Sequence, residues 1–332
     1  MSDVTIYDVA NQAKVSIATV SRVINFPHQV SERTRQRVLS TIDQLGFVPK
    51  AEAIARARKS TGRIGVVTPF FTQSSFVQRL RGVAQTLLSS TYELVIYNAD
   101  SPAHCRSHLE SLPIVRRLDG LIIMSLLIDD EIAERLQKYE LYTVMVETAH
   151  PAFSGVYIDN EAGGRLAAEF LCAQGHQRLG FIGGDIEIPG YTLHTSELRL
   201  AGYQKALEKA GQSLPSSYIG MAPFSLEQAC FQTHKLLDLP KPPTAIFAAS
   251  DTQALGVLKA ARERGLKVPE DLAVLGFDDL EIAEYIGLTT ISQSLDESGR
   301  VAVELLLARL ADPSRAVQQV RLPLKVLPRQ TA

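Results

Sequence analysis

The stretch TIYDVANQAKVSIATVSRVIN, residues 5–25, determines how the first part of this chain folds. Thr5 can cap a helix together with Asp8 three residues later, and the apolar residues that follow recur along one helical face. Ser16 is suited to cap a second helix, because the valines before and after it have the spacing of a hydrophobic staple. The pattern predicts two short helices that meet at a fixed angle.

The second predicted helix has an apolar side and a mixed side. Val20, Val23 and Ile24 share the side that we expect to be buried. The opposite side carries Ile17, Ala18, Ser21, Arg22 and Asn25. A third helix is predicted from Ser31, because apolar residues recur at core spacing up to Gly46, which can adopt the left-handed cap conformation. The first 48 residues therefore predict a compact three-helix headpiece.

Charge is unevenly distributed along the 332 residues. The whole chain has a formal net charge of −2, yet basic residues outnumber acidic ones before Thr61. A basic head on an acidic body suits a polyanionic partner at one end only. From the charge pattern taken alone, a solvated charged face is the alternative interpretation.

Bulk composition indicates an ordered globular protein. Apolar residues make up 45% and charged residues 21% of the chain, both near globular averages. No apolar stretch is long enough to cross a bilayer and no export signal opens the sequence, which predicts a cytoplasmic protein with no membrane contact. The three cysteines lie far apart and are odd in number, so neither a disulfide framework nor a zinc site is predicted.

The sequence lacks the common motifs of nucleotide-binding and metal-dependent enzymes. The chain contains no G-x-G-x-x-G and no G-x-x-x-x-G-K-[ST] motif, and the histidines show no recognisable spacing for a metal site or an activated nucleophile. The sequence therefore predicts a protein that is not an enzyme and that needs no cofactor or metal.

Beyond Gly62, short apolar runs alternate with amphipathic helical patterns, which is typical of parallel sheets. The predicted strands are IGVV from Ile64, ELVIY from Glu93, GLIIM from Gly120, TVMV from Thr143, LGFI from Leu179, TAIFA from Thr244 and AVLGF from Ala273. Helical patterns between them include residues 79–88, 165–173, 200–210 and 253–264. The series predicts two similar doubly wound lobes with a ligand crevice at the carboxyl ends of their strands.

The pattern T-I-Y-D-V-A-x-x-A-x-V-S-x-x-T-V-S-R-V-I-N resembles the headpiece of the lactose/galactose repressor (LacI/GalR) family, and the core resembles periplasmic sugar-binding proteins. The resemblance implies an α/β protein with an all-α helix-turn-helix headpiece and a two-lobed core of doubly wound parallel sheets. The expected domains are a headpiece (1–48), a hinge helix or linker (49–61) and a ligand-binding and dimerisation core (62–332). Lobe 1 is expected over 62–159 and 291–323, and lobe 2 over 160–290 and 324–332.

In that family the second helix lies in the major groove of DNA. The resemblance implies that Ile17, Ala18 and Arg22 read base edges, with Arg22 able to contact guanine bidentately. Further positions match residues that meet phosphates, namely Thr5, Ser16, Thr19, Ser21, Asn25 and Thr34. Helix capping is an alternative role for them, compatible with the first. Arg35 is expected to contact phosphate without regard to sequence.

Two departures from the family pattern concern the turn and the hinge. Lys14 stands in the turn where the family usually has Gly, and a left-handed backbone conformation at Lys14 would be slightly strained. In the hinge, Arg56 stands where the family has a Leu that wedges into the minor groove. Arg56 would suit a narrow, electronegative minor groove, and Ile54 could supply a substitute wedge.

Asp278 follows a strongly apolar predicted strand in the segment GFDD, where its carboxylate could accept hydrogen bonds from two hydroxyls. Arg199, in RLAGY, is the complementary donor. Both match polyol-binding positions of the family, with an inter-lobe ion pair as the alternative interpretation. Phe70 and Phe224 match positions that flank a sugar face, with core filling as the alternative. The remaining ligand positions implied by the resemblance are Thr72, Ser74, Met124, Glu147, Ser250, Asp251 and Gln293.

The sequence thus predicts a nucleoid-associated repressor whose affinity for a pseudo-palindromic operator is controlled allosterically by a small effector, a sugar or sugar derivative. A homodimer would place two recognition helices in successive major grooves. No heptad extension follows Pro323, so a dimer without a tetramerising zipper is expected. The alternative is a ligand-binding protein whose head has lost or altered its DNA binding.

Overall fold

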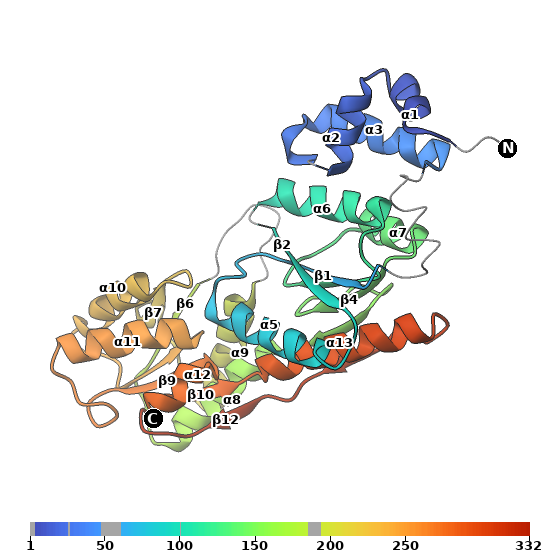
Figure 1. Ribbon diagram of the computed structural model, residues 1–332. Helices are drawn as coiled ribbons and strands as arrows, with labels where there is room; N and C mark the ends of the chain where they lie inside the picture. The colour runs from blue at the N-terminus through green and yellow to red at the C-terminus, as the bar shows by residue number, and fades with distance from the viewer. Residues whose placement is uncertain (1–3, 26, 48–60, 100, 185–193) are drawn as a thin grey trace. The chain divides into compact units, whose positions relative to one another are not determined.

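The computed structural model describes residues 4–25, 27–47, 61–99, 101–184 and 194–332 (Figure 1). The described part of the headpiece consists of the α-helices α1 (Ile6–Ala13), α2 (Ile17–Asn25) and α3 (Glu32–Leu45), with the 3-10 turn η1 (Pro27–Gln29) between the last two. Among the described residues, no helix combines the length and apolarity that crossing a bilayer requires.

The predicted helix signals of the headpiece are confirmed. The Thr5 backbone N–H donates to Asp8 Oδ2 at 2.8 Å, as the capping box requires. The Thr19 N–H donates to Ser16 Oγ at 3.1 Å, which caps α2. Lys14 ends α1 in the left-handed conformation, with φ 52° and ψ 50°. The turn between α1 and α2 is therefore set by a lysine at the position where the family usually has a glycine.

The first parallel sheet of the core has the strand order β11-β5-β4-β3-β1-β2. Its strands are β1 (Arg63–Thr68), β2 (Glu93–Asn98), β3 (Gly120–Met124), β4 (Tyr142–Val146), β5 (Ser154–Tyr157) and β11 (Gln319–Arg321). The helices that alternate with these strands, or follow them late in the chain, are α5 (Ser74–Leu87), α6 (Pro102–Val115), α7 (Asp130–Lys138) and α13 (Leu295–Ala311).

The second sheet has the order β12-β10-β9-β8-β6-β7. Its strands are β6 (Leu179–Gly183), β7 (Ile219–Met221), β8 (Ala245–Ala248), β9 (Ala273–Asp278), β10 (Thr289–Ser292) and β12 (Lys325–Leu327). Its helical elements are α8 (Asn160–Ala173), α9 (Thr195–Lys209), η2 (Ser216–Tyr218), α10 (Leu226–Leu237), α11 (Asp251–Glu263) and α12 (Glu281–Tyr285).

The two sheets repeat one topology, because β2-β1-β3-β4-β5 and β7-β6-β8-β9-β10 have the same order of strands. The pairs within each of these runs are parallel, and β12 pairs antiparallel to β10. All seven predicted strands occur, and the duplicated doubly wound fold is confirmed. In such sheets ligands bind at the carboxyl ends of the strands, where the strand order reverses at β1 and at β6.

The strands that the sequence did not reveal are short or lie at the edges. Strand β7 has three residues, and β10, with the sequence TTIS, carries more hydroxyls than aliphatic groups. Neither forms the apolar run from which strands were predicted. Their positions depend on pairing with β6 and β9, which are long apolar strands.

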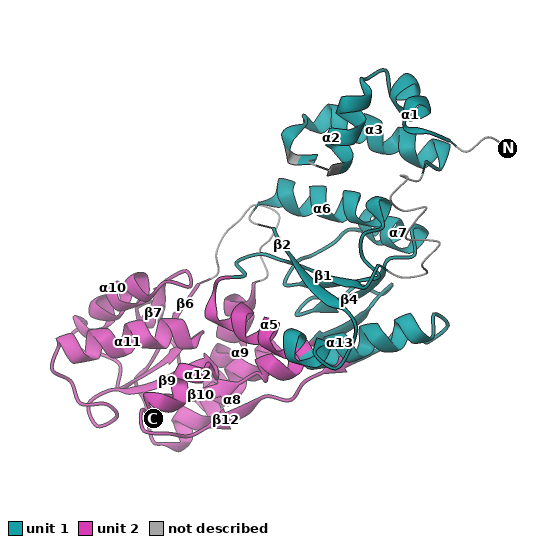
Figure 2. Ribbon diagram, in the orientation of Figure 1, with its two compact units in different colours: residues 1–71, 83–156, 300–319 teal, residues 72–82, 157–299, 320–332 magenta. Residues whose placement is uncertain are grey.

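The chain divides into two compact units, coloured separately in Figure 2. Unit 1 consists of residues 1–71, 83–156 and 300–319, and unit 2 consists of residues 72–82, 157–299 and 320–332. Unit 1 contains the headpiece and most of the first sheet. Unit 2 contains the second sheet with the helices that pack on it.

Helices α8 and α9 of unit 2 cross at unusually short range. A Cβ atom added at Gly164 would lie 1.8 Å from the backbone oxygen of Arg199, and one added at Gly202 would lie 1.9 Å from the oxygen of Glu161. Only glycine permits this approach of the two backbones. The crossing therefore fixes the segment of α9 that carries Arg199.

Replacing Gly164 by alanine is expected to lower the free energy of unfolding of unit 2 by about 1–3 kcal/mol, because the added methyl forces the helices apart. This cost should exceed the gain of about 1 kcal/mol in helix propensity. Urea unfolding followed by circular dichroism measures the change. Arg165→Ala, at an exposed position of the same helix, should stay within about 0.5 kcal/mol of the wild type. An unchanged stability of Gly164→Ala would contradict the close crossing.

Candidate DNA-binding surface and ligand site

Helix α2 exposes the side chains that the sequence predicts for base reading. Ile17 is 40% exposed, and Ala18 and Arg22 are also exposed. Val20 and Val23 on the opposite side are fully buried against α1 and α3. The helix can therefore present one small, apolar and basic stripe to a partner without losing its packing.

The predicted phosphate-binding positions divide into exposed and half-buried residues. Ser16 and Thr5 are exposed at the first turns of their helices, whereas Thr19, Ser21 and Thr34 are half-buried. Ser16 Oγ and Thr19 Oγ1 are 2.9 Å apart, so the hydroxyl that caps α2 also contacts the hydroxyl of a second predicted phosphate-binding residue. The side chain of Asn25, and the hinge residues Ile54 and Arg56, lie outside what the structure describes.

Arg35 differs from the expectation of a phosphate contact. Its side chain is 4% exposed, and its guanidinium lies 2.5 Å from Glu32 and 3.4 Å from Glu110 of α6. The helical position of Arg35 faces inward on α3, which composition and charge counting could not reveal. Arg33 and Arg37 on the same helix are exposed instead.

In unit 2, Arg199 lies close to the carboxyl ends of the strands of the second sheet. The guanidinium carbon is 3.6 Å from the centroid of the Phe277 ring, a stacked cation–π arrangement. Nε donates to Asn160 Oδ1 at 2.9 Å, and Nη1 donates to the Ala249 carbonyl at 2.5 Å. The buried side chain, 3% exposed, is thereby held in one orientation.

Asp278 ends β9 beside Arg199, with Oδ1 3.9 Å from Arg199 Nη1. The same carboxylate oxygen accepts a hydrogen bond from Gln293 Nε2 at 2.5 Å. The structure thus brings the predicted residues Arg199, Asp278 and Gln293 together within one unit. Because Arg199 and Asp278 both belong to unit 2, the ion pair suggested as an inter-lobe contact lies within one lobe.

Ser250 and Asp251 have partners inside unit 2 that give them structural roles. Ser250 caps α11 by accepting a hydrogen bond from Gln253 N at 3.1 Å. Asp251 is 0% exposed, and its carboxylate accepts from Leu280 N at 2.7 Å and from Thr290 Oγ1 at 2.5 Å. These bonds tie the start of α11 to β10 and to the segment before α12.

Unit 1 carries a second group of polar side chains at strand ends. Ser125 follows β3 and Glu147 follows β4, and the Ser125 hydroxyl donates to Glu147 Oε2. Glu147 was predicted from the sequence, but Ser125 was not. Met124, which the sequence predicts as a ligand position, is the last residue of β3 and fully buried. The sequence pattern did not show that β3 ends at Met124, so that Ser125 is the first residue after the strand.

Strain is concentrated at these strand ends. Phe70, Ser125, Glu147 and Asp278 all have positive φ, at 47°, 55°, 67° and 129°. Non-glycine residues rarely adopt this backbone conformation, and where they do the strain commonly accompanies a functional site. Three of these four positions were predicted as ligand-binding residues from the sequence.

The other predicted ligand positions are accessible to different degrees. Phe70 and Phe224 are half-buried, so neither is a pure core residue. Thr72 and Ser74, at the start of α5, are exposed. Their role in binding stays a prediction.

A helix-turn-helix headpiece, followed by duplicated doubly wound sheets that each carry polar residues at their strand ends, defines a DNA-binding regulator with a periplasmic-binding-protein-like ligand domain. Comparison with known families agrees. Residues 5–50 match "Bacterial regulatory proteins, lacI family", and residues 168–332 match "Periplasmic binding protein-like domain".

Individual relatives cover almost the whole chain. Catabolite control protein A of Priestia megaterium is 33% identical over 333 residues, covering 99% of each chain. The structure of the lac repressor dimer bound to operator and the anti-inducer ONPF is similar with a TM-score of 0.70 and 30% identity, covering 99% of each chain. The transcriptional regulator CelR–cellobiose complex has a TM-score of 0.70 and 29% identity, covering 99% of this chain and 100% of that one. The chain belongs to the lacI family of bacterial transcriptional regulators.

The buried carboxyl of Asp251 predicts a pH dependence of stability. Burial raises its pKa from the ordinary 3.8 to about 6, against the lowering effect of its hydrogen bonds. Between about pH 4 and pH 6, the Asp251 carboxyl therefore holds a proton in the folded chain that it has released in the unfolded chain. The stability that this proton contributes is full below about pH 4 and is lost as the pH rises through about 6.

Asp251→Asn removes this titration, so the free energy of unfolding of the variant minus that of the wild type should increase between pH 4 and pH 7. Urea unfolding at several pH values measures the difference. Glu270→Gln, at an exposed carboxylate of the same unit, serves as the control and should show a constant difference. A difference for Asp251→Asn that does not change with pH would show that Asp251 is ionised in the fold.

Proposed function

We propose that this protein is a repressor that binds a pseudo-palindromic operator as a homodimer and is released from it by a sugar or sugar derivative. The observation that supports a sugar effector is the fixed pair formed by Arg199 of α9 and Asp278 at the end of β9. A guanidinium and a carboxylate side by side offer donors and acceptors to neighbouring hydroxyls. The apolar faces of a sugar ring suit the half-buried rings of Phe70 and Phe224.

The CelR relative binds cellobiose, as the description of its complex states, which supports a carbohydrate effector for this chain. Glu147 and Ser125 of unit 1 supply a further acceptor and a hydroxyl at strand ends. Each unit therefore carries, at its own strand ends, polar groups of the kind that bind polyols. The strained backbone at these residues holds the groups in place before a ligand arrives.

DNA binding is assigned to α2, with Arg22 as the residue that reads a base. Arg22 can donate two hydrogen bonds to a guanine, whereas Ile17 and Ala18 can offer only apolar contacts, for example to a thymine methyl. Sequence discrimination by hydrogen bonds through this helix should therefore depend mainly on Arg22. The dimeric lac repressor bound to operator supports a twofold arrangement of two such helices.

Coupling between the two functions follows from linkage. A sugar that binds one arrangement of the core more tightly than another shifts the population toward that arrangement. If the shifted arrangement has the lower operator affinity, the sugar reduces binding by the ratio of its two affinities, and operator DNA reduces sugar affinity by the same factor. The proposal places the protein in the cytoplasm with the nucleoid and gives it no catalytic step.

Binding to the DNA upstream of the protein's own gene, compared with random DNA over a range of salt, tests the proposal. Selective binding with a steep salt dependence is expected for a regulator that contacts several phosphates. Equal, weak binding to both DNAs, with sugar binding retained, would favour a ligand-binding protein that has lost its DNA function.

Arg22→Ala should reduce the preference for operator over random DNA by about 1–3 kcal/mol, because the bidentate base contact is lost. Arg22 is exposed, so the fold of the headpiece should be unaffected. Arg37→Ala removes the same charge from an exposed position of α3 and should change binding to both DNAs by similar factors. If Arg22→Ala weakens both equally, Arg22 contacts phosphate and not a base.

Asp278→Asn should raise the sugar concentration needed for half-release of the operator at least tenfold, because a charged acceptor is worth about 1.5–3 kcal/mol. A panel of mono- and disaccharides that includes cellobiose first identifies the sugar that releases the wild type. Operator affinity without sugar should stay the same. Asp271→Asn, an exposed site in the same unit, is the control. An unchanged half-release concentration in Asp278→Asn would remove Asp278 from the sugar site.

A further inference from the structure

Within the described residues, one group of cysteine, histidine and acidic side chains brings its donor atoms within 4.8 Å of one another: Cys230, His234 and Glu263. Cys230 and His234 are four residues apart on α10, so they project from the same face of that helix. Glu263 is the last residue of α11. Because α11 begins at Asp251, its far end lies about 18 Å along the helix axis from that residue.

The distances between these donor atoms suit a tetrahedral ion. Cys230 Sγ lies 3.6 Å and His234 Nε2 lies 2.9 Å from the same oxygen, Glu263 Oε2. Zinc bonds of about 2.3 Å to sulfur and about 2.0 Å to nitrogen and oxygen separate sulfur from oxygen by about 3.5 Å and nitrogen from oxygen by about 3.3 Å. These two distances are therefore within a few tenths of an ångström of those that zinc requires, and the sulfur-to-nitrogen distance is no more than 4.8 Å.

The charges around the cluster leave the required atoms available. Lys259 donates to the other carboxylate oxygen of Glu263, Oε1, so Oε2 still faces the cysteine and the histidine. The cluster is open to solvent, because the side chains of Glu263 and His234 are 42% and 29% exposed. Cys230 lies beneath them and is 7% exposed.

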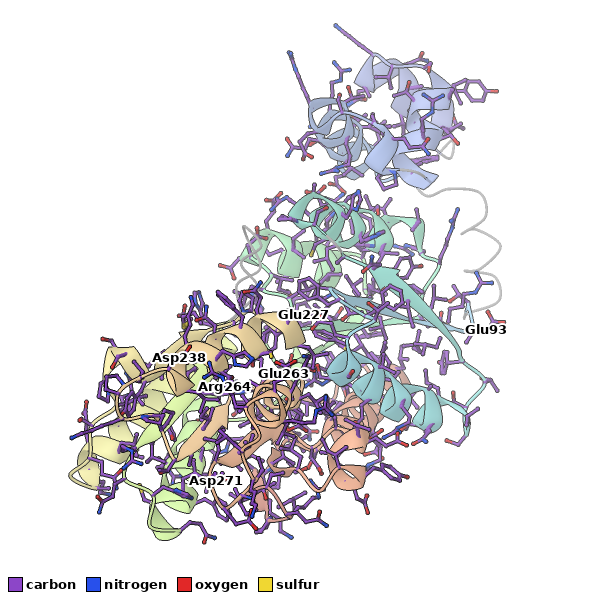
Figure 3. All side chains as sticks on the ribbon, turned by 90° about the vertical axis from the view of Figure 1, so that its left-hand side faces the viewer. Glu93, Glu227, Asp238, Glu263, Arg264 and Asp271 are labelled. Atoms are coloured by element: carbon purple, nitrogen blue, oxygen red, sulfur yellow. The ribbon has the colours of Figure 1, made fainter. Side chains whose placement is uncertain are left out.

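Two basic neighbours oppose metal binding, namely Lys259, whose ammonium group pairs with Glu263, and Arg264. Arg264 Nε donates to His234 Nδ1 at 3.0 Å, which leaves the imidazole proton on Nε2, pointing at Glu263. An ion on Nε2 requires that proton to move to Nδ1, and Arg264 must then release its bond. Arg264 would still have an ionic partner after releasing His234, because its Nη2 lies 2.6 Å from Asp238 Oδ1. Figure 3 shows Glu263, Arg264 and Asp238 grouped on one face of the protein.

We propose that Cys230, His234 and Glu263 form a site for one divalent cation of borderline softness, best matched by Zn²⁺, with water as the fourth ligand. Sulfur, imidazole and carboxylate are the donor set that zinc takes in proteins. Binding releases one proton, from the thiol, while the imidazole stays neutral by moving its proton between its two nitrogens. The ion would join α10 to the end of α11 and so stabilise unit 2.

No zinc site was predicted from the sequence, because no cysteine or histidine was recognised at metal-ligand spacing from any cysteine, although His234 is four residues from Cys230. The spacing of Cys230 and His234 was visible on α10. Glu263 is 29 residues further along the chain than His234, so only the packing of α11 against α10 brings it to them. The site is therefore a product of tertiary structure.

Titration of the full-length, chelator-treated protein with Zn²⁺ and Co²⁺ tests the proposal. We expect one equivalent to bind, Co²⁺ to give a sulfur-to-cobalt charge-transfer band, and Zn²⁺ to raise the melting temperature. Cys230→Ser should abolish the band and weaken Zn²⁺ binding at least tenfold. Glu263→Gln should weaken binding while keeping the band. Arg264→Ala should strengthen binding, because the competing hydrogen bond to His234 is removed.

Cys172→Ser is the matched control, since Cys172 is a half-buried thiol of the same unit without these neighbours. It should leave both the band and the affinity unchanged. Retained operator binding and circular dichroism show that each variant is folded. The proposal is overturned if Co²⁺ gives no charge-transfer band, if Cys230→Ser binds Zn²⁺ like the wild type, or if Cys172→Ser loses binding to the same extent.

Discussion

The burial of parallel strands on both faces is the constraint from which the rest of this structure follows. Strands such as β3 and β9 are buried along their whole length, so their side chains must be apolar or engaged in hydrogen bonds. Polar groups that can meet a ligand are left to the strand ends. Ser125, Glu147 and Asp278 occupy such ends, and each has a strained backbone. The sheets thus determine where chemistry can occur, and the residues at the ends determine which chemistry.

Arg199 shows how a remote contact supports this arrangement. The residue lies on α9, and any side chain in place of Gly164 of α8 would clash with its backbone oxygen. The ring of Phe277, the residue before Asp278, stacks against the guanidinium of Arg199 in a cation–π contact. One helix crossing and one aromatic ring therefore hold Arg199 beside Asp278, so a ligand of the proposed sugar site would meet side chains that are already ordered.

The same unit combines two kinds of polar cluster on opposite ends of α11. At the start of α11, Ser250 caps the helix, and the Asp251 carboxylate accepts hydrogen bonds from Leu280 and Thr290. These bonds hold the helix against the sheet. At its end, Glu263 reaches α10, where it meets a thiol and an imidazole. A metal there would act on the packing of the two helices and would not touch the strand ends directly.

The headpiece and the duplicated sheets were determined by the sequence itself, because both depend on local signals. A capping box at Thr5, a cap at Ser16 and a glycine at position 46 are read within a few residues, and long apolar runs predict buried strands wherever they occur. Tertiary structure alone decided what depends on distant partners. The short strand β10 forms through its pairing with β9, Arg35 turns inward to acidic partners, and Ser125 and Glu263 acquire their neighbours only when separate elements pack. Such contacts join residues far apart in the chain, and no local pattern records them.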